Sequence, residues 1–290
     1  MMARAGSEIA APAGSRRIPR RWWLYAVLGI GFVVMVAPFV WMALGAFKSQ
    51  AELLEVPPTW WPRDPTLSNF SRLFERLDFP RYFFNSVLIA GAVTLSNLLV
   101  CSMVGYALAK LDFRGRRALL LVVLATLMVP PGSVVTIVPL FILMSKLDLV
   151  NTYASVILPF AAGPFGVFLM RQFMLGVPDE LLDAARVDGA NEFTVFFRIA
   201  LPLVVPGLAA LGIFIFQATW NNCLWPLVAL TDDQMYTLPV ALATFARGQY
   251  QADFGLLMSG ALLIVLPIIL VFLLLQRYFT QSIAMTGIRG

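Results

Sequence analysis

Histidine is absent from this 290-residue chain, and cysteine and charged residues are scarce. Without histidine, no imidazole can serve as a general acid or base, a metal ligand or a pH-dependent switch. The two cysteines, Cys101 and Cys223, lie far apart inside apolar runs, which argues against a disulfide framework and a Cys-x-x-Cys metal site. Only 13% of the residues are charged, against about 25% in soluble domains. This composition excludes a water-soluble protein of this length.

Long apolar runs take the place of the missing charges, and 60% of the residues are hydrophobic. A bilayer core about 30 Å thick is crossed by roughly 20 helical residues. Six stretches of at least 22 residues contain no Asp, Glu, Lys or Arg: residues 22–47, 82–109, 118–145, 149–170, 199–231 and 254–276. The sequence therefore predicts an all-α integral membrane protein with six transmembrane helices. A seventh apolar stretch, 234–246, contains Pro239 and is too short to span, so we expect it in a loop near the membrane surface.

The distribution of lysine and arginine predicts the orientation, because short cytoplasmic loops are enriched in basic residues. With residues 1–21 in the cytoplasm, 14 basic residues fall inside and 7 outside. We therefore expect both termini in the cytoplasm, as tails over 1–21 and 277–290. An extracytoplasmic loop over 48–81, rich in proline and aromatic residues, then separates the first transmembrane helix, 22–47, from a membrane core over 82–276.

The basic residues ahead of the first apolar run are also typical of a signal peptide. The run itself is longer than the apolar core of about 7–15 residues found in signal peptides. We therefore interpret it as a retained transmembrane helix.

One predicted cytoplasmic loop, 171–201, has a more regular pattern than the others. Pro178, followed by two acidic residues, is typical of a helix start, since proline fits the first turn and negative charge favours the positive end of the helix dipole. Gly189 predicts the end of that helix, and Asn191 can cap a second one. The loop is thus predicted to form two short helices around a glycine turn.

Two interpretations of this helix pair stay open on these grounds alone. An amphipathic helix pair can simply lie on the inner surface of the membrane. Alternatively, Ala184 and Ala185 beside Gly189 allow another backbone to come close, while Asp183 and Arg186 provide charges around that contact. Such a helix suits a groove in a separate cytoplasmic protein.

The same segment resembles the EAA loop of the permease subunits of bacterial ATP-binding-cassette (ABC) importers. That motif reads Glu-Ala-Ala, three residues, Gly, nine residues, then Ile-x-Leu-Pro. Here Asp183-Ala184-Ala185, Gly189 and Ile199-Ala200-Leu201-Pro202 keep this spacing, with Asp183 where Glu is usual. Further segments are similar to the carbohydrate-uptake, maltose-type branch: Phe84-Asn85-Ser86, Trp220-Asn221-Asn222-Cys223-Leu224-Trp225-Pro226 and Thr237-Leu238-Pro239-Val240. The resemblance covers residues 20–290.

The resemblance implies ATP-driven sugar import across the bacterial plasma membrane. The implied partners are a second permease, forming a heterodimer within the membrane lipid, a dimer of cytoplasmic ATP-binding subunits, and an extracytoplasmic solute-binding protein, with no nucleic acid. The sugar stays open among mono-, di- and oligosaccharides and polyol phosphates. The implied ATPase-coupling residues are Asp183, Ala184, Ala185, Gly189, Ile199, Leu201 and Pro202.

The same resemblance implies a transport subunit and not an enzyme. The chain has no GxxxxGK[ST] phosphate loop, so ATP and Mg²⁺ are expected on the partner ATPase and no cofactor on this chain.

Polar side chains in the predicted spans are candidates for contact with the sugar, because polar groups within a membrane are costly and commonly functional. The main candidates are Asn85 and Asn97 in the second span and Gln217, Trp220, Asn221 and Asn222 in the fifth, with Thr94, Ser96 and Thr219 beside them. Each can instead form hydrogen bonds between helices, and tryptophan can lie at the membrane interface. Both interpretations stay open.

Two other classes of protein compete with an importer subunit. A secondary transporter is consistent with six spans, although proton-coupled carriers usually place a charged residue inside the membrane and these runs have none. An integral-membrane enzyme would need a reactive cluster, and the acidic residues of 171–201 are already explained as helix-capping groups.

Overall fold

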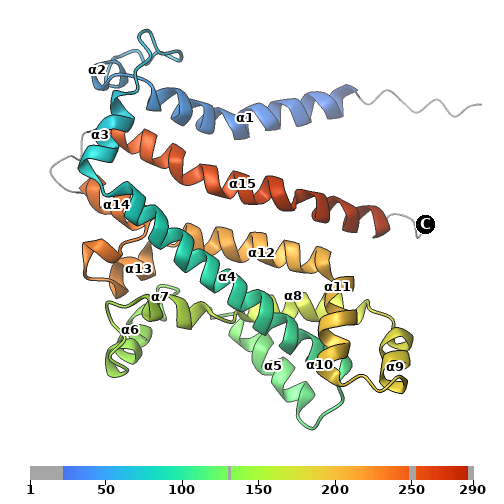
Figure 1. Ribbon diagram of the computed structural model, residues 1–290. Helices are drawn as coiled ribbons and strands as arrows, with labels where there is room; N and C mark the ends of the chain where they lie inside the picture. The colour runs from blue at the N-terminus through green and yellow to red at the C-terminus, as the bar shows by residue number, and fades with distance from the viewer. Residues whose placement is uncertain (1–21, 130–131, 248–252, 287–290) are drawn as a thin grey trace, which may run out of the picture. The chain divides into compact units, whose positions relative to one another are not determined.

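The computed structural model describes residues 22–129, 132–247 and 253–286, which form helices and turns with no strand among them. The helices are α1 (Trp22–Ala46), α2 (Gln50–Leu53), α3 (Ser68–Arg76), α4 (Phe79–Lys110), α5 (Arg116–Thr126), α6 (Ile137–Lys146), α7 (Tyr153–Ile157), η1 (Leu158–Phe160), α8 (Pro164–Leu175), α9 (Asp179–Val187), α10 (Glu192–Val195), the π-helical η2 (Phe196–Ala200), α11 (Leu201–Leu203), α12 (Val205–Trp220), α13 (Leu224–Ala229), η3 (Asp233–Met235), α14 (Leu238–Arg247) and α15 (Phe254–Thr286). Figure 1 shows this order along the chain.

The chain divides into two compact units, residues 1–41 and 42–290. The described part of the first unit is the N-terminal portion of α1, an uncharged apolar helix. All the sites below belong to the second unit.

Three helices are long and apolar enough to cross a membrane: Trp23–Ala46, Phe79–Lys110 and Phe254–Arg277. They coincide with the first, second and sixth predicted spans. The last of them continues as helix to Thr286, into the segment expected as a C-terminal tail.

The fourth and fifth predicted spans are bent pairs of helices. The first pair, Tyr153–Phe160 with Pro164–Leu175, bends by 41°, and the second, Glu192–Leu203 with Val205–Trp220, bends by 80°. If each pair is one span, the described residues hold up to five candidate spans.

The third predicted span, 118–145, is not one continuous helix. Helix α5 ends at Thr126, and α6 begins only at Ile137 and is too short to span alone. The sequence between them contains Pro130-Pro131-Gly132, in which proline lacks an N–H donor and disfavours helix in the preceding residue. Gly132 has a φ of +74°. The described helices therefore do not confirm the predicted count of six.

The core of the second unit is built around α4, with α8 and α12 packed along it and α15 against α12 (Figure 1). Glycine permits the close approach of α4 and α8, since a Cβ on Gly105 would lie 2.8 Å from the backbone nitrogen of Arg171. Small residues at such crossings are typical of helices packed in membranes. The apolar core that results includes side chains of α4, α8, α9, η2 and α12.

Buried hydrogen bonds hold in place the two segments expected outside the membrane, 48–81 and 234–246. The side-chain amide of Asn69, in α3, donates to the carbonyls of Ala46 and Lys48 at 2.8 Å each. The stretch 234–246, expected in a loop, is mostly the ten-residue helix α14. Ser86 Oγ accepts from the backbone N–H of Leu238 at 2.8 Å and holds the start of α14 against α4.

Candidate coupling hairpin and membrane pathway

Helix α9 begins where the sequence predicts, and it is fixed to the end of α4. Pro178 is the extended residue just before the helix, with Asp179 and Glu180 in the first turn. Lys110, in the last turn of α4, donates through Nζ to Asp179 Oδ1 and to the Val177 carbonyl, both at 2.6 Å. The start of α9 is therefore held by a charge-assisted contact with a lysine whose side chain is almost fully buried.

The turn after α9 has the glycine conformation that the motif predicts. Gly189 adopts a φ of +85°, a region that non-glycine residues enter at a cost of about 1–2 kcal/mol. Asn191 Oδ1 then accepts the backbone N–H of Thr194 at 2.8 Å and caps α10. The prediction of two short helices around a glycine turn is confirmed. Residues 178–200 are called the α9–α10 hairpin below.

A polar network joins the two arms of the hairpin to α4. Glu192 accepts Arg186 Nε at 2.7 Å and the hydroxyl of Tyr106 at 2.8 Å. Arg186 also donates through Nη1 to Asp183 at 2.8 Å. Tyr106 belongs to α4, so one carboxylate connects α9, α10 and a long apolar helix.

The charges of this network reinforce one another. The guanidinium of Arg186 lowers the pKa of Glu192 from its ordinary value, against the opposing effect of burial, and the Tyr106 hydroxyl adds to the lowering. Glu192 in turn raises the pKa of Arg186. Both groups are therefore charged at neutral pH, and the contact stays a charge-assisted one.

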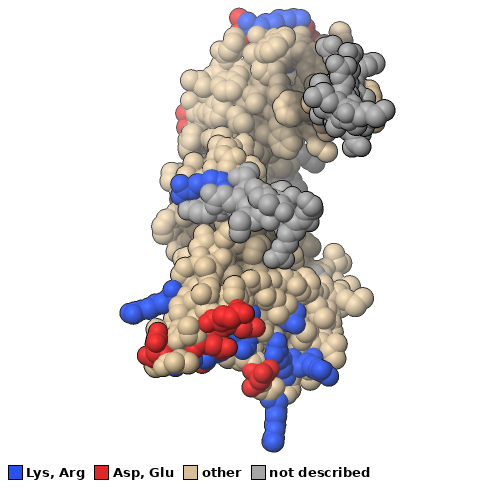
Figure 2. Space-filling view, turned by 90° about the vertical axis from the view of Figure 1, so that its right-hand side faces the viewer, with Lys and Arg blue, Asp and Glu red and all other residues tan. Residues whose placement is uncertain are grey.

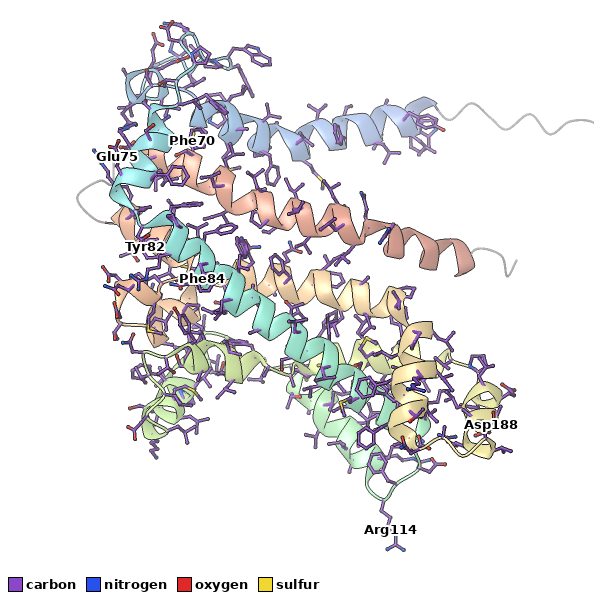
Figure 3. All side chains as sticks on the ribbon, in the orientation of Figure 1. Phe70, Glu75, Tyr82, Phe84, Arg114 and Asp188 are labelled. Atoms are coloured by element: carbon purple, nitrogen blue, oxygen red, sulfur yellow. The ribbon has the colours of Figure 1, made fainter. Side chains whose placement is uncertain are left out.

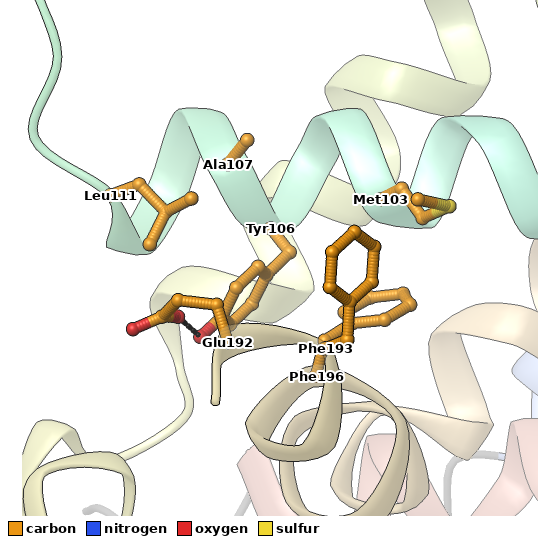
Figure 4. A pocket seen from close by; sticks show the side chains of 7 residues that line it. All are labelled: Met103, Tyr106, Ala107, Leu111, Glu192, Phe193 and Phe196. Carbon is orange, nitrogen blue, oxygen red and sulfur yellow. Dashed lines mark hydrogen bonds between the residues drawn. The ribbon is translucent and has the colours of Figure 1, made fainter. Parts of the chain in front are cut away.

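An apolar cavity of about 260 Å³ lies beside the network, between α4 and the start of α10 (Figure 4). It is lined by Met103, Tyr106, Ala107, Leu111, Glu192, Phe193 and Phe196. In Figure 4, the Tyr106–Glu192 hydrogen bond closes one side, and the rings of Phe193 and Phe196 face α4.

The structure divides the predicted ATPase-coupling residues between the surface and the core. Asp183, Ala184, Gly189 and Pro202 are exposed. Ala185, Ile199 and Leu201 are half-buried and pack against the core shared with α4 and α8. The exposed side also carries Asp188, labelled in Figure 3, and the apolar side chain of Val187, which is 87% exposed. The hairpin thus has an anchored face and a free face.

Three predicted pathway residues meet at one cavity. Asn97 of α4, Thr219 of α12 and Asn222 after it line a cavity of about 420 Å³, together with Phe160 and Phe165. Amide and hydroxyl groups beside aromatic rings are the combination that carbohydrates bind. Asn97 is also structural, since its Nδ2 donates to the Phe160 carbonyl at 2.6 Å and its Oδ1 accepts the N–H of Gly163 at 2.9 Å.

The other pathway candidates lie elsewhere. Asn85 is buried, with its amide donating to the carbonyls of Gln234 and Tyr236 and its Oδ1 accepting the hydroxyl of Tyr153. Trp220 is buried and donates through Nε1 to the Ile264 carbonyl at 3.0 Å. Gln217 and Asn221 are exposed and do not line the 420 Å³ cavity.

Sequence reasoning missed Tyr106 and Lys110 as partners of the hairpin. Both lie in the last two turns of α4, more than 65 residues from their acceptors Glu192 and Asp179. The only local signal is an unusual pair of polar groups at the end of an apolar run, which reveals nothing about a distant partner. Among the described residues, no group of three or more Cys, Asp and Glu is arranged to hold a metal ion.

Residues 101–285 match the family model described as "Binding-protein-dependent transport system inner membrane component". The matched part contains both arms of the hairpin and Tyr106. The chain belongs to this family. It is a permease, the membrane-embedded transport subunit of an ABC importer, and a multi-pass protein of the bacterial inner membrane.

Curated relatives of this permease are similar over nearly their whole length. The arabinooligosaccharides transport system permease protein AraQ of Halalkalibacterium halodurans is 41% identical, over 92% of this chain and 96% of the relative. The lactose transport system permease protein LacG of Rhizobium radiobacter is 35% identical, over 89% and 93%. The trehalose/maltose transport system permease protein MalG of Thermococcus litoralis is 29% identical, over 89% and 93%.

Solved structures share the fold of the permease. A chain from the crystal structure of a bacterial ABC transporter involved in the import of the acidic polysaccharide alginate superposes with a TM-score of 0.80. The match covers 93% of this chain and 100% of that chain, at 23% sequence identity.

Proposed function

We propose that the permease imports a neutral di- or oligosaccharide, as one half of a heterodimeric membrane pathway. Its partners are a second permease, a cytoplasmic ATPase dimer that binds ATP and Mg²⁺, and an extracytoplasmic solute-binding protein. The substrate class is supported by the relatives, whose names specify arabinooligosaccharides, lactose and trehalose or maltose. The chain itself binds no cofactor and catalyses no reaction in this proposal.

In the membrane, the proposed arrangement has six spans and both termini in the cytoplasm. The interrupted segment α5–α6 and the first bent pair each count as one span, and the second bent pair crosses the membrane through α12, with α10 and η2 on the cytoplasmic side. The 14 basic residues on the inner side support this orientation. It puts the α9–α10 hairpin in the cytoplasm and α3 and α14 outside.

The single observation that carries the coupling role is the two-sided construction of the α9–α10 hairpin. Its inner face, including Leu182, Val195 and Ala200, is buried in the same core as α4 and α8. Its outer face leaves Ala184 and Gly189 open, and a Cβ on Gly189 would meet nothing within 4 Å. A helix that is rigidly joined to the core and free on its other side transfers the motion of a docked partner to the spans.

The proposed sugar path runs along the 420 Å³ cavity between α4, α8 and α12. Asn97, Thr219 and Asn222 supply polar groups there, while Phe160 and Phe165 supply aromatic faces. The second permease would close the remaining side.

Co-purification with the ATPase subunit tests the docking role. Gly189→Arg puts a long charged side chain on the free face, and Gly189→Ala is the matched control because it has the same backbone strain without the bulk. We expect the arginine variant to lose the ATPase and the alanine variant to retain it. If the arginine variant retained the ATPase and normal uptake, the hairpin would not be the docking element.

Uptake of a labelled arabinooligosaccharide or lactose by cells expressing the whole transporter tests the transport role. Depletion of ATP should abolish uptake even when ion gradients are maintained. Uptake that persists without ATP would instead identify a secondary transporter. The partner solute-binding protein should bind the same sugar.

A further inference from the structure

A strongly basic cleft lies at the end of α4, and none of the predicted sugar contacts lines it. It has a volume of about 840 Å³, and its lining includes Asp112, Phe113, Arg116, Arg117, Leu120 and Arg171. These residues come from the α4–α5 turn, the first turns of α5 and the middle of α8. Figure 2 shows basic side chains at the lower edge of the molecule, with acidic side chains beside them. We call this site the arginine cleft.

The last turn of α4 holds two of the guanidinium groups side by side. The carbonyl oxygen of Leu108 accepts Arg116 Nε at 3.0 Å and Arg171 Nε at 3.3 Å. Arg116 Nη2 also donates to the Ala109 carbonyl at 3.0 Å. Arg171 reaches this position because Gly105 lets α8 cross α4 at backbone contact. The placement of these positive charges is therefore built into the helix crossing.

The positive charge of the cleft is not balanced by the residues that line it. Its one carboxylate, Asp112, accepts Arg116 Nη1 at 2.8 Å and is otherwise fully exposed to solvent. Within the described part of the chain, the guanidinium of Arg117 and the terminal nitrogens of Arg171 have no acceptor. Like charges held this close repel one another, and an anion bound between them would relieve that repulsion while accepting charge-assisted hydrogen bonds.

The start of α5 adds to the attraction for an anion. No side chain caps this eleven-residue helix, whose first residue is Arg116. The first N–H groups of a helix lack intrahelical acceptors and lie at the positive end of its dipole.

We propose that the arginine cleft binds the phosphate group of an anionic phospholipid in the cytoplasmic leaflet. Apolar side chains of α5 follow the cleft by about one turn, with Leu121 66% and Val122 58% exposed. A ligand with a phosphate at Arg117 and Arg171 and an acyl chain along α5 satisfies both features, whereas free phosphate satisfies only the first. The site has no role in the proposed sugar path, but its assignment to the inner leaflet depends on the orientation in "Proposed function".

Retention of lipid by the intact purified transporter tests the site. The whole complex is exchanged into mixed micelles of phosphatidylglycerol and phosphatidylcholine, and bound lipid is counted by native mass spectrometry. The test variants are Arg117→Gln, at an exposed side chain with no hydrogen bond or ion pair in the described structure, and the double variant Arg117→Gln/Arg171→Gln. Arg114→Gln is the matched control, since Arg114 extends away from α5 in Figure 3 and does not line the cleft.

We expect the wild type and Arg114→Gln to retain phosphatidylglycerol in preference to phosphatidylcholine. Occupancy should fall about fivefold in Arg117→Gln and about 25-fold in the double variant. Equal retention in all variants, or equal retention of the two lipids, would overturn the proposal.

Two further outcomes would assign the cleft to another anion. If excess inorganic phosphate displaces phosphatidylglycerol from the wild type, the cleft is a site for a free anion and not for a lipid. If the double variant loses the ATPase subunit but keeps its lipid, the cleft contacts an acidic surface of that protein. The orientation is tested separately by labelling Arg114→Cys, in a background of Cys101→Ser and Cys223→Ser, from either side of the membrane. A position 114 labelled from outside would refute the orientation without affecting lipid retention.

Discussion

Replacing Tyr106 with phenylalanine removes one hydrogen bond between α4 and the α9–α10 hairpin and leaves the ring in place. The hydroxyl donates to the charged carboxylate of Glu192 at 2.8 Å, while the ring packs against Phe196 with centroids 5.3 Å apart. Since the ring contacts persist, the variant separates the polar link from the packing around it.

The expected magnitude follows from the surroundings of the acceptor. Hydrogen bonds to charged groups contribute about 1.5–3 kcal/mol. The side chain of Glu192 is 44% exposed and keeps Arg186 as a partner, so we expect the lower end, about 1.5 kcal/mol. This corresponds to roughly a tenfold shift towards conformations in which the hairpin has loosened from α4.

Two assays on the assembled transporter measure this shift. Hydrogen exchange over residues 178–200 should accelerate about tenfold in Tyr106→Phe. The stimulation of ATP hydrolysis by the sugar-loaded binding protein should fall, while the ATPase remains bound because the free face of the hairpin is unaltered.

The control is Tyr153→Phe, which removes a similar hydroxyl donor, here to Asn85 Oδ1 at 2.9 Å, from the other end of α4. It should leave exchange in the hairpin unchanged. In a double-mutant cycle, Tyr106→Phe and Glu192→Gln should be non-additive, since both affect one contact. Unchanged exchange and unchanged ATPase stimulation in Tyr106→Phe would refute the view that this network links the hairpin to α4.

Three further predictions concern charge, packing and the membrane pathway. The pKa of Glu192 is lower in the folded protein than its ordinary value of 4.5. The network therefore stabilises the fold above pH 4.5, and this stabilisation is lost as the pH falls through the folded pKa. Glu192→Gln should flatten the acid limb of a plot of melting temperature against pH. Gly105→Val should lower the free energy of unfolding by about 1–3 kcal/mol or more, because the valine side chain would overlap the α8 backbone. Gly91→Ala is the control, since a Cβ there lies in open space and should not destabilise the protein. Equal melting temperatures for the two variants would contradict the prediction. Asn97→Leu should reduce sugar uptake and lower the free energy of unfolding by about 1–3 kcal/mol for each backbone group left unpaired. Asn221→Leu, at an exposed site outside the cavity, should retain uptake. Normal uptake in Asn97→Leu with reduced uptake in Asn221→Leu would remove Asn97 from the pathway.

The α9–α10 hairpin was predictable because its determinants are local. A proline followed by acidic residues starts a helix, a glycine adopts positive φ, and an asparagine side chain caps the next N–H groups; Pro178, Gly189 and Asn191 do this within 14 residues. The long apolar helices α4 and α15 were predictable for a similar reason, since hydropathy and the absence of charge act along a single segment.

The broken third span shows where local reasoning was insufficient. Absence of charge permits insertion into the membrane but does not require a continuous helix, and residues 118–145 form two shorter helices. For Asn85 and Trp220, polarity inside a span left both sugar contact and hydrogen bonding between helices open, and the structure shows that their side-chain nitrogens donate to distant backbone carbonyls.

The sequence by itself determined that this is a membrane protein, which runs are apolar enough to insert, and where the α9–α10 hairpin turns. These properties depend on side-chain chemistry and on backbone preferences over a few residues. Only the tertiary structure decided that Tyr106 reaches Glu192, that Asn97 meets Thr219 at a cavity, and that Arg171 lies beside Arg116. Those contacts join residues more than 50 positions apart, and they exist because α4, α8 and α12 cross at close range.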